Sequence, residues 1–262
     1  MGKQARLVAL FVIATFVASW ALWAGAAAAG LGGWGFIGGT VMPAVVALGL
    51  TAWRDGSAAA AALAAQAARW RAGVGWYALA LFFMAAVKLA AAGLQRLIIG
   101  TWPTFGDTAL VLVLLGVLIS TPVQAGEEIG WRGFMTPRLA ALVGWRGAGL
   151  ITGVVWATWH LPMFFIAGGD MVGQSFPVFA LSVTAIAVVM TAIYVGTRSS
   201  LLLTKLMHSA VNNTTGIVPS RAPAAGVFTL ASSPMGWLTA AVLWGAAAGF
   251  LVWMPKVKAP PR

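Results

Sequence analysis

Glutamate and histidine are rare in this chain, and every one of them falls in a short motif surrounded by apolar sequence. The only glutamates are Glu127 and Glu128, and the only histidines are His160 and His208. An ionisable side chain placed in lipid costs about 2.5 kcal/mol or more. Each of these four residues is therefore a candidate functional residue.

The spacing of the first motif separates its two carboxylates. Glu128 and Arg132 are four residues apart, with the acid first, which is the favourable order for an ion pair on one helix face. Glu127 is turned about 100° away from Glu128 at 3.6 residues per turn. We therefore predict that Arg132 neutralises Glu128, and that Glu127 is the carboxylate available for chemistry.

The two histidine motifs each place a second side chain one helical turn from the imidazole. Trp156 precedes His160 by four residues, and Pro162 then disturbs the backbone hydrogen bonds of that turn. His208 precedes Asn212 by four residues, so one helix face presents an imidazole and an amide.

A carboxylate and two imidazoles can hold and deprotonate a water molecule, and a nearby amide N–H can stabilise an oxyanion. This chemistry is typical of a hydrolase. The same Glu127, His160 and His208 could instead bind zinc and leave one position open for water. Spacing does not choose between these alternatives, because the three side chains come from separate helices.

The composition predicts an all-α, polytopic membrane protein. The chain is 61% hydrophobic and only 8% charged, whereas soluble domains are about 25% charged. The absence of cysteine excludes thiol nucleophiles and thiolate metal sites. A bundle of about eight transmembrane helices is expected, near residues 7–28, 35–53, 74–94, 109–128, 148–166, 177–196, 200–218 and 236–254.

The first apolar segment is too long for the apolar region of a signal peptide, so we interpret it as a retained transmembrane helix. The whole chain, 1–262, is expected to be a single integral-membrane domain with its motif-bearing core at about 109–218. Residues 57–72 are weakly apolar and flanked by charge, which favours an amphipathic helix on the membrane surface.

The net charge of +11 comes from basic residues dispersed at the ends of apolar segments, a topology signal and not a nucleic-acid-binding pattern. Only Arg96 and Arg221 lie clearly on the face opposite the other basic residues, so both termini are expected in the cytoplasm. The expected location is the plasma membrane of a bacterium. Lys88 and Lys205 lie inside helices, and their long stems are expected to carry the ammonium toward an interface.

The three motifs are expected at one depth in the bilayer. Glu127 precedes Arg138 by 11 residues, and His208 follows Arg198 by 10. His160 follows Arg146 by 14 residues. At about 1.5 Å per residue, all three side chains lie roughly 15 to 21 Å from the cytoplasmic end, near the middle of a core about 30 Å thick.

These motifs resemble those of the CAAX prenyl protease and bacteriocin-processing (CPBP) family. The run 126–134, Gly-Glu-Glu-Ile-Gly-Trp-Arg-Gly-Phe, is similar to its EExxxR motif. Residues 156–160 are similar to its FxxxH motif, with Trp156 in place of phenylalanine, and 208–212 to its HxxxN motif. The order and spacing agree from about residue 120 to 216, and a bundle of eight helices also agrees.

The resemblance implies an intramembrane glutamic endopeptidase. In such an enzyme Glu127 and His160 would activate water, His208 would assist, and Asn212 would contribute to the oxyanion hole. Glu128, Arg132 and Trp156 would support the site.

The implied substrate is a membrane-associated protein or peptide, prenylated or not, and the implied partners are that substrate and the lipid bilayer, without nucleic acid. No cofactor is expected, with zinc on Glu127, His160 and His208 as the alternative. Two other functions stay open: a noncatalytic immunity or scaffold protein, and a proton-coupled transporter. The transporter is disfavoured because the sequence shows no evident inverted repeat.

Overall fold

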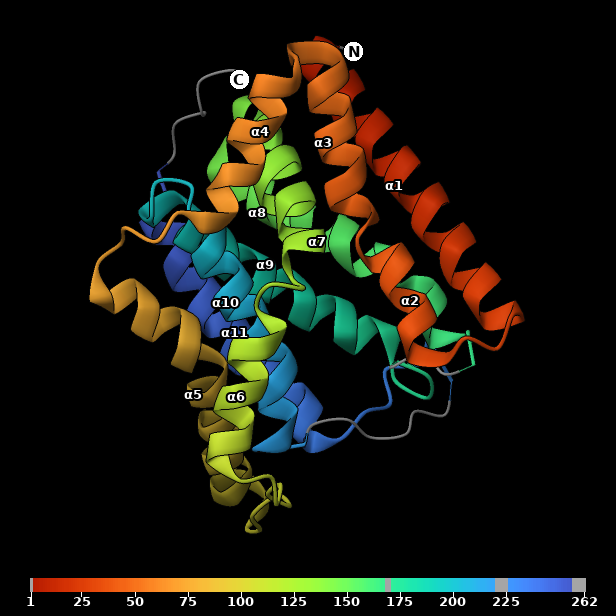
Figure 1. Ribbon diagram of the computed structural model, residues 1–262. Helices are drawn as coiled ribbons and strands as arrows, with labels where there is room; N and C mark the ends of the chain where they lie inside the picture. Colours follow the sequence, from red (N-terminus) through yellow and green to blue (C-terminus); the bar gives the residue numbers. More distant parts are fainter. Residues whose placement is uncertain (1, 168–170, 220–225, 256–262) are drawn as a thin grey trace.

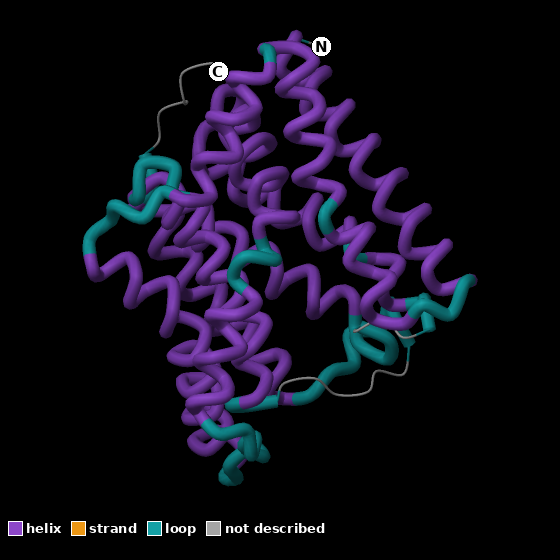
Figure 2. Tube along the Cα trace, in the orientation of Figure 1, coloured by secondary structure: helices purple, strands orange, loops and turns teal. Residues whose placement is uncertain are grey.

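The computed structural model describes residues 2–167, 171–219 and 226–255, and all regular structure in these ranges is helical (Figure 2). The predicted all-α class is confirmed. Arg221, used above to predict orientation, lies outside the described residues.

The helices follow one another along the chain with short connections. In order they are α1 Lys3–Ala28, α2 Gly32–Thr40, α3 Met42–Asp55, α4 Ser57–Ala65, η1 Gln66–Ala68, α5 Val74–Ile99, α6 Leu110–Ser120, α7 Ala125–Glu128, η2 Ile129–Met135, α8 Thr136–Trp159, η3 Leu161–Phe164, α9 Phe176–Gly196, α10 Leu201–Asn213, η4 Thr214–Gly216 and α11 Pro234–Trp253.

Within the described ranges, six helical segments are long and apolar enough to cross a membrane, and the protein is an integral membrane protein. They are Lys3–Ala28, Gly35–Asp55, Val74–Ile99, Ala125–Trp159, Phe176–Gly196 and Pro234–Trp253. The other predicted segments form shorter helices or parts of these.

The predicted segment 109–128 is not one helix. Helix α6 ends at Ser120, a turn follows over 121–124, and α7 then begins at Ala125. Pro122, in the turn, has no N–H to continue the hydrogen-bond ladder of α6. As a consequence, Glu127 and Glu128 lie in the first turn of a helical run that extends to Trp159, and not at the end of a preceding helix.

Two further boundaries differ from the prediction. The segment predicted at 148–166 is the second half of that long run, and it ends at Trp159, just before the break expected at Pro162. The segment predicted at 200–218 forms a helix of only 13 residues, α10, followed by the single 3₁₀ turn η4.

The long run departs from regular α-helix at two places. Residues 129–135, the segment η2, have wider π-helical turns, a form often found at functional sites. Within α8, Gly144 has φ 77° and ψ 166°, and there the helix kinks. A side chain would disfavour that backbone conformation, which glycine adopts freely.

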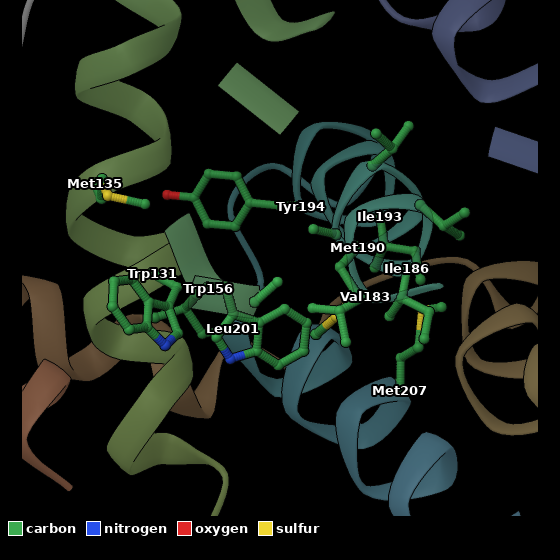
Figure 3. Close-up of a cluster of buried hydrophobic side chains, with 14 of the residues drawn as sticks. Trp131, Met135, Trp156, Val183, Ile186, Met190, Ile193, Tyr194, Leu201 and Met207 are labelled. Atoms are coloured by element: carbon green, nitrogen blue, oxygen red, sulfur yellow. The ribbon is translucent and has the colours of Figure 1, made fainter. Parts of the chain in front are cut away.

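Helices α8 and α9 pack against each other at the centre of the bundle (Figure 1). Helices α1 and α3 lie on one side of this pair, where α1 contacts α8 and α3 contacts η2. On the other side, α5 packs against α10 and α11, and α6 packs against α10. The buried core between them is built from large side chains such as Trp131, Met135, Met190, Tyr194 and Leu201 (Figure 3).

The backbone of η2 lies unusually close to α3. A Cβ atom built on Gly130 would lie 2.5 Å from the carbonyl oxygen of Pro43, closer than van der Waals contact allows. Glycine at this position therefore permits α3 to pack directly on the segment that carries Arg132.

The segment predicted as an amphipathic helix, 57–72, is helical from Ser57 to Ala68. The Tyr194 hydroxyl donates to Oε1 of the buried Gln66 side chain (3.0 Å), which fixes this segment to α9. Arg69, just after it, donates to the carbonyl oxygen of Arg198 (3.2 Å). Its position at the membrane surface stays a prediction.

Candidate active site

The two glutamates occupy the start of a helix. Glu127 and Glu128 lie in the first turn of α7, after the turn 121–124. The first backbone N–H groups of α7 are bonded to carbonyl oxygens of the turn 121–124, and the aligned peptide dipoles of the helical run that follows leave a partial positive charge at its start, which stabilises carboxylates there. The break between α6 and α7 thus gives both acids a favourable local environment inside an apolar protein.

The predicted ion pair is present. Arg132 Nη1 donates to Glu128 Oε1 at 2.7 Å, and both side chains are fully buried. Nε and Nη2 of this guanidinium have no hydrogen-bond partner among the described residues. The guanidinium instead lies 4.2 Å from the centre of the Trp156 ring, a cation–π contact that contributes more when it is desolvated.

Glu128 also holds the second imidazole, a contact that the sequence analysis did not foresee. His208 Nδ1 lies 3.0 Å from Glu128 Oε1. A carboxylate that is already paired with Arg132 accepts hydrogen bonds, so Nδ1 carries the proton and donates it. In the neutral ring, Nε2 is then the acceptor nitrogen.

The first imidazole is oriented by backbone. His160 Nδ1 lies 2.8 Å from the carbonyl oxygen of Trp156, an atom that can only accept a hydrogen bond. The proton of the neutral His160 ring is therefore on Nδ1, and Nε2 is again the acceptor. Both imidazoles present the same nitrogen for water, a proton or a metal ion.

The helix end that carries His160 is fastened to α1. The Trp20 indole N–H donates to the carbonyl oxygen of Trp159 at 2.9 Å, across 139 residues of sequence. The rings of Trp23 and Trp159 pack with centroids 4.6 Å apart, and the Trp131 ring lies 5.6 Å from that of Trp159. Trp131 and Trp159 thus pack against each other at the end of α8.

Trp156 does more than pack. Its Nε1–H donates to Glu127 Oε2 at 2.7 Å, and its ring makes edge contacts with both His160 (5.7 Å) and His208 (5.0 Å). The sequence signal for this role was the tryptophan in place of the phenylalanine of the FxxxH motif, because only an indole has an N–H to donate.

One cavity of about 420 Å³ brings the motifs together. Its lining includes Glu127, Trp156, His160, His208 and Asn212, which come from α7, the end of α8 and α10. The structure thus gathers all the side chains that the sequence analysis placed at a common depth. Depth in a bilayer itself stays a prediction.

Asn213, to which no role was assigned, bonds locally. Its Nδ2 donates to Ser209 O (2.9 Å) and to Ser120 Oγ (3.1 Å), which joins α10 to α6. The neighbouring Asn212 is the asparagine that lines the cavity.

The cavity also has lining residues from outside the motifs, among them Trp23, Lys88, Gln124 and Thr239. Lys88 and Lys205 are both buried within the bundle, and Lys88 lines the cavity, so the expectation of an ammonium carried out to an interface is wrong for Lys88 and stays a prediction for Lys205. Lys88 was not among the predicted site residues. Its signal in the sequence was a cation in the middle of an apolar helix.

Among the residues described here, no three or more His, Asp or Glu side chains are gathered closely enough to hold a metal ion. Glu128, the carboxylate nearest to His208, is already engaged by Arg132 and His208.

Comparison with known proteins bears on the same part of the chain. The sequence pattern of the Rce1-like family, described as type II CAAX prenyl endopeptidases, matches residues 107–214. This region is similar to the Rce1-like family. The Rce1-like region runs from the residues just before α6 to the end of α10 and includes every motif residue named above.

The chain also resembles CAAX prenyl protease 2 of Methanococcus maripaludis, with 27% identity over 112 residues. The match covers 40% of this chain and 40% of that protein, so the chain spans less than half of the length of the relative. The Rce1-like match confirms the family resemblance drawn from the three motifs.

Proposed function

We propose that this protein is an intramembrane endopeptidase of the glutamic type. The observation that carries the proposal is the single cavity lined by Glu127, His160, His208 and Asn212. A carboxylate, two imidazoles whose Nε2 atoms are acceptors and an amide are groups that can carry out peptide hydrolysis by activated water. The Rce1-like family of residues 107–214 supports the same reaction class.

In the proposed reaction, His160 Nε2 positions a water molecule and Glu127 removes one of its protons. The water oxygen attacks the peptide carbonyl carbon, and the carbonyl electron pair moves onto its oxygen. The Asn212 amide N–H stabilises this oxyanion, and His208 Nε2 assists. The C–N bond then breaks, and the proton held by Glu127 passes to the leaving nitrogen.

The other polar residues act by positioning. Arg132 keeps Glu128 ionised, Glu128 holds the tautomer of His208, and Trp156 holds one oxygen of Glu127. This arrangement assigns the proton from water to the second oxygen of Glu127, Oε1.

The proposed substrate is a protein or peptide at the membrane. Because the relative from Methanococcus maripaludis is named a CAAX prenyl protease, the first substrate to test is an S-farnesylated peptide that ends in Cys-aliphatic-aliphatic-X. An unmodified peptide of the same sequence tests whether the prenyl group is needed.

The test uses the full chain in liposomes and follows peptide cleavage by mass spectrometry. Glu127→Gln should reduce the rate by about 10² to 10⁴, the usual contribution of a general base, with the protein still inserted and folded. Asn212→Ala should also lower the rate, whereas Asn213→Ala, its neighbour, should leave the rate near that of the wild type. Wild-type cleavage by Glu127→Gln would contradict the proposal.

A chelator separates the glutamic mechanism from the zinc alternative. Cleavage that depends on Glu127 and persists in EDTA and 1,10-phenanthroline is the expected result. Loss of cleavage with chelator, and its recovery on adding zinc, would instead assign Glu127, His160 and His208 as metal ligands.

A further inference from the structure

A buried lysine shares the cavity with the proposed catalytic residues. Lys88, in the middle of α5, is only 2% exposed and lines the cavity, as does Met84 one turn earlier. Lys88 lies outside the residues that match the Rce1-like family, 107–214. The Lys88 ammonium carries three N–H donors, so it can bind a ligand in the cavity in addition to its contact within the bundle.

Helix α11, which packs against α5, places the Thr239 hydroxyl at about the height of Lys88 along the bundle. Helices α5 and α11 pack side by side (Figure 1), and the rings of Trp76 and Trp253 meet at one end with centroids 5.7 Å apart. Ala91 and Met235 share a buried cluster near the other end, so the two helices are antiparallel. Lys88 lies twelve residues after Trp76 on α5, and Ala241 lies twelve residues before Trp253 on α11. Thr239 is two residues from Ala241, so Lys88 and Thr239 lie at about the same height along the two helices.

Thr239 is suited to bind the same ligand. It lines the cavity, it is buried, and its hydroxyl has no hydrogen-bond partner among the described residues. A buried hydroxyl without a partner is costly unless a ligand or a water molecule satisfies it. Lys88 and Thr239 therefore offer an ammonium and a hydroxyl donor to an anionic group inside the cavity.

The polar side chains discussed here reach the cavity from two sets of helices. The groups that can activate water, Glu127, His160 and His208, are on α7, α8 and α10, whereas Lys88 and Thr239 are on α5 and α11. Lys88 is the one lysine or arginine among the described residues that line the cavity. A substrate that places an anion near Lys88 would thus be held at a position distinct from Glu127.

We propose that Lys88, assisted by Thr239, binds the C-terminal carboxylate of the peptide substrate. This inference rests on the proposed peptidase function. A cavity of about 420 Å³ is within the usual size of small-ligand pockets, about 300 to 1,000 Å³, so it admits a short stretch of chain. A chain that ends there presents a carboxylate, which is ionised at neutral pH and needs a paired cation when buried. Lys88 then determines how far from the end of the substrate the cleaved bond lies.

The first experiment measures binding with cleavage disabled. The Glu127→Gln variant in detergent is titrated with one S-farnesylated peptide in two forms, a free C-terminal acid and a C-terminal amide. The acid should bind about tenfold more tightly, as expected for a charged hydrogen bond. Adding Lys88→Met should bring the two affinities within about twofold, while Lys88→Arg should keep the preference.

Two further variants complete the comparison. Thr239→Val should reduce the preference by about threefold, the loss of one hydrogen bond, and it provides a test if Lys88→Met does not fold. Lys3→Met removes an exposed lysine at the start of α1 and should change neither affinity. A third peptide, an amide with an internal aspartate, tests whether any carboxylate is accepted.

Equal binding of acid and amide would overturn the inference, and so would a Lys88→Met variant that weakens both equally. Binding of the aspartate-containing amide as tightly as the free acid would overturn the assignment to the C-terminus. If the acid is preferred but the wild type cleaves neither peptide, the binding site stands and the proposed peptidase function fails. If the wild type cleaves both forms at equal rates, the function stands and the role of Lys88 fails.

Discussion

At the scale of single residues, the candidate site is a chain of contacts in which each group fixes the next. Arg132 holds Glu128, Glu128 holds His208, and Trp156 contacts Glu127, Arg132 and both imidazoles. Glu127, His160 and His208 are thus each supported by a buried neighbour. Substituting such a neighbour tests the site without removing its chemistry.

Trp156→Phe removes the hydrogen bond to Glu127 and keeps an aromatic ring in place. A hydrogen bond to a charged group contributes about 1.5 to 3 kcal/mol, so we expect kcat to fall by about 10- to 100-fold. The apparent melting temperature should change little. Peptide cleavage and thermal unfolding in detergent, measured on the same preparation, check this, and unchanged kcat would show that the N–H does not position Glu127.

The buried ion pair gives a prediction about two residues together. Glu128→Met alone leaves the Arg132 guanidinium buried without its partner and should cost about 3 to 5 kcal/mol in stability. The double variant Glu128→Met, Arg132→Met should recover much of that loss, because no charge is then stranded.

Catalysis should not recover with stability in the double variant, since nothing then holds the Nδ1–H of His208. Thermal unfolding and cleavage are measured for both variants. A double variant that regains wild-type cleavage would show that Glu128 and Arg132 serve only the fold.

At the scale of secondary-structure elements, the break between α6 and α7 and the π-helical segment η2 determine where the motif residues lie. The break places Glu127 and Glu128 at the start of a helix, and η2 places the Arg132 guanidinium against the face of the Trp156 ring. Helix α3 braces η2 from outside at Gly130.

The close contact at Gly130 predicts a sensitive position. In Gly130→Ala the new Cβ would meet the Pro43 carbonyl oxygen, a backbone atom that cannot move alone. We expect a loss of about 1 to 3 kcal/mol in stability, the usual cost of overpacking. Gly49→Ala on α3 is the matched control, because nothing lies within 4 Å of its Cβ position. Equal melting temperatures for the two variants would contradict the close packing.

The sequence was informative about helical faces and less so about helix boundaries. The i, i+4 spacing correctly predicted the Glu128–Arg132 pair and the neighbouring rings of Trp156 and His160, because such contacts depend only on helix geometry. The turn at 121–124 was missed, although Pro122 and the polar residues beside it interrupt the apolar run there. The Trp156–Glu127 and Glu128–His208 bonds join different helices, so no local pattern could reveal them.

At the scale of the whole molecule, the motif helices are enclosed by helices from both ends of the chain. Trp23 and Thr40 from the N-terminal part, and Gly236 and Thr239 from α11, line the same cavity as Glu127. The fold thus surrounds the Rce1-like region with walls that lie outside it.

The orientation of the bundle is open to a direct test. Arg69 bonds to the backbone of Arg198, and Arg146 bonds to the backbone of Val252 and Met254, which brings basic positions from distant parts of the chain to common ends of the helices. By the positive-inside rule we expect both termini in the cytoplasm. Fusions of green fluorescent protein should fluoresce at either terminus, and alkaline phosphatase fused there should be inactive. Active phosphatase at one terminus would contradict this topology.

The contribution of α11 to the cavity has a consequence during synthesis of the protein. All the motif residues have been translated by Asn212, and the Trp20 bond to Trp159 can form as soon as α8 enters the membrane beside α1. The wall that carries Gly236 and Thr239 is translated later, within the last 30 residues of the described chain. A nascent chain in which α11 is not yet translated therefore holds the proposed catalytic groups in a cavity that is open on one side, and the cavity is complete only once α11 has joined the bundle.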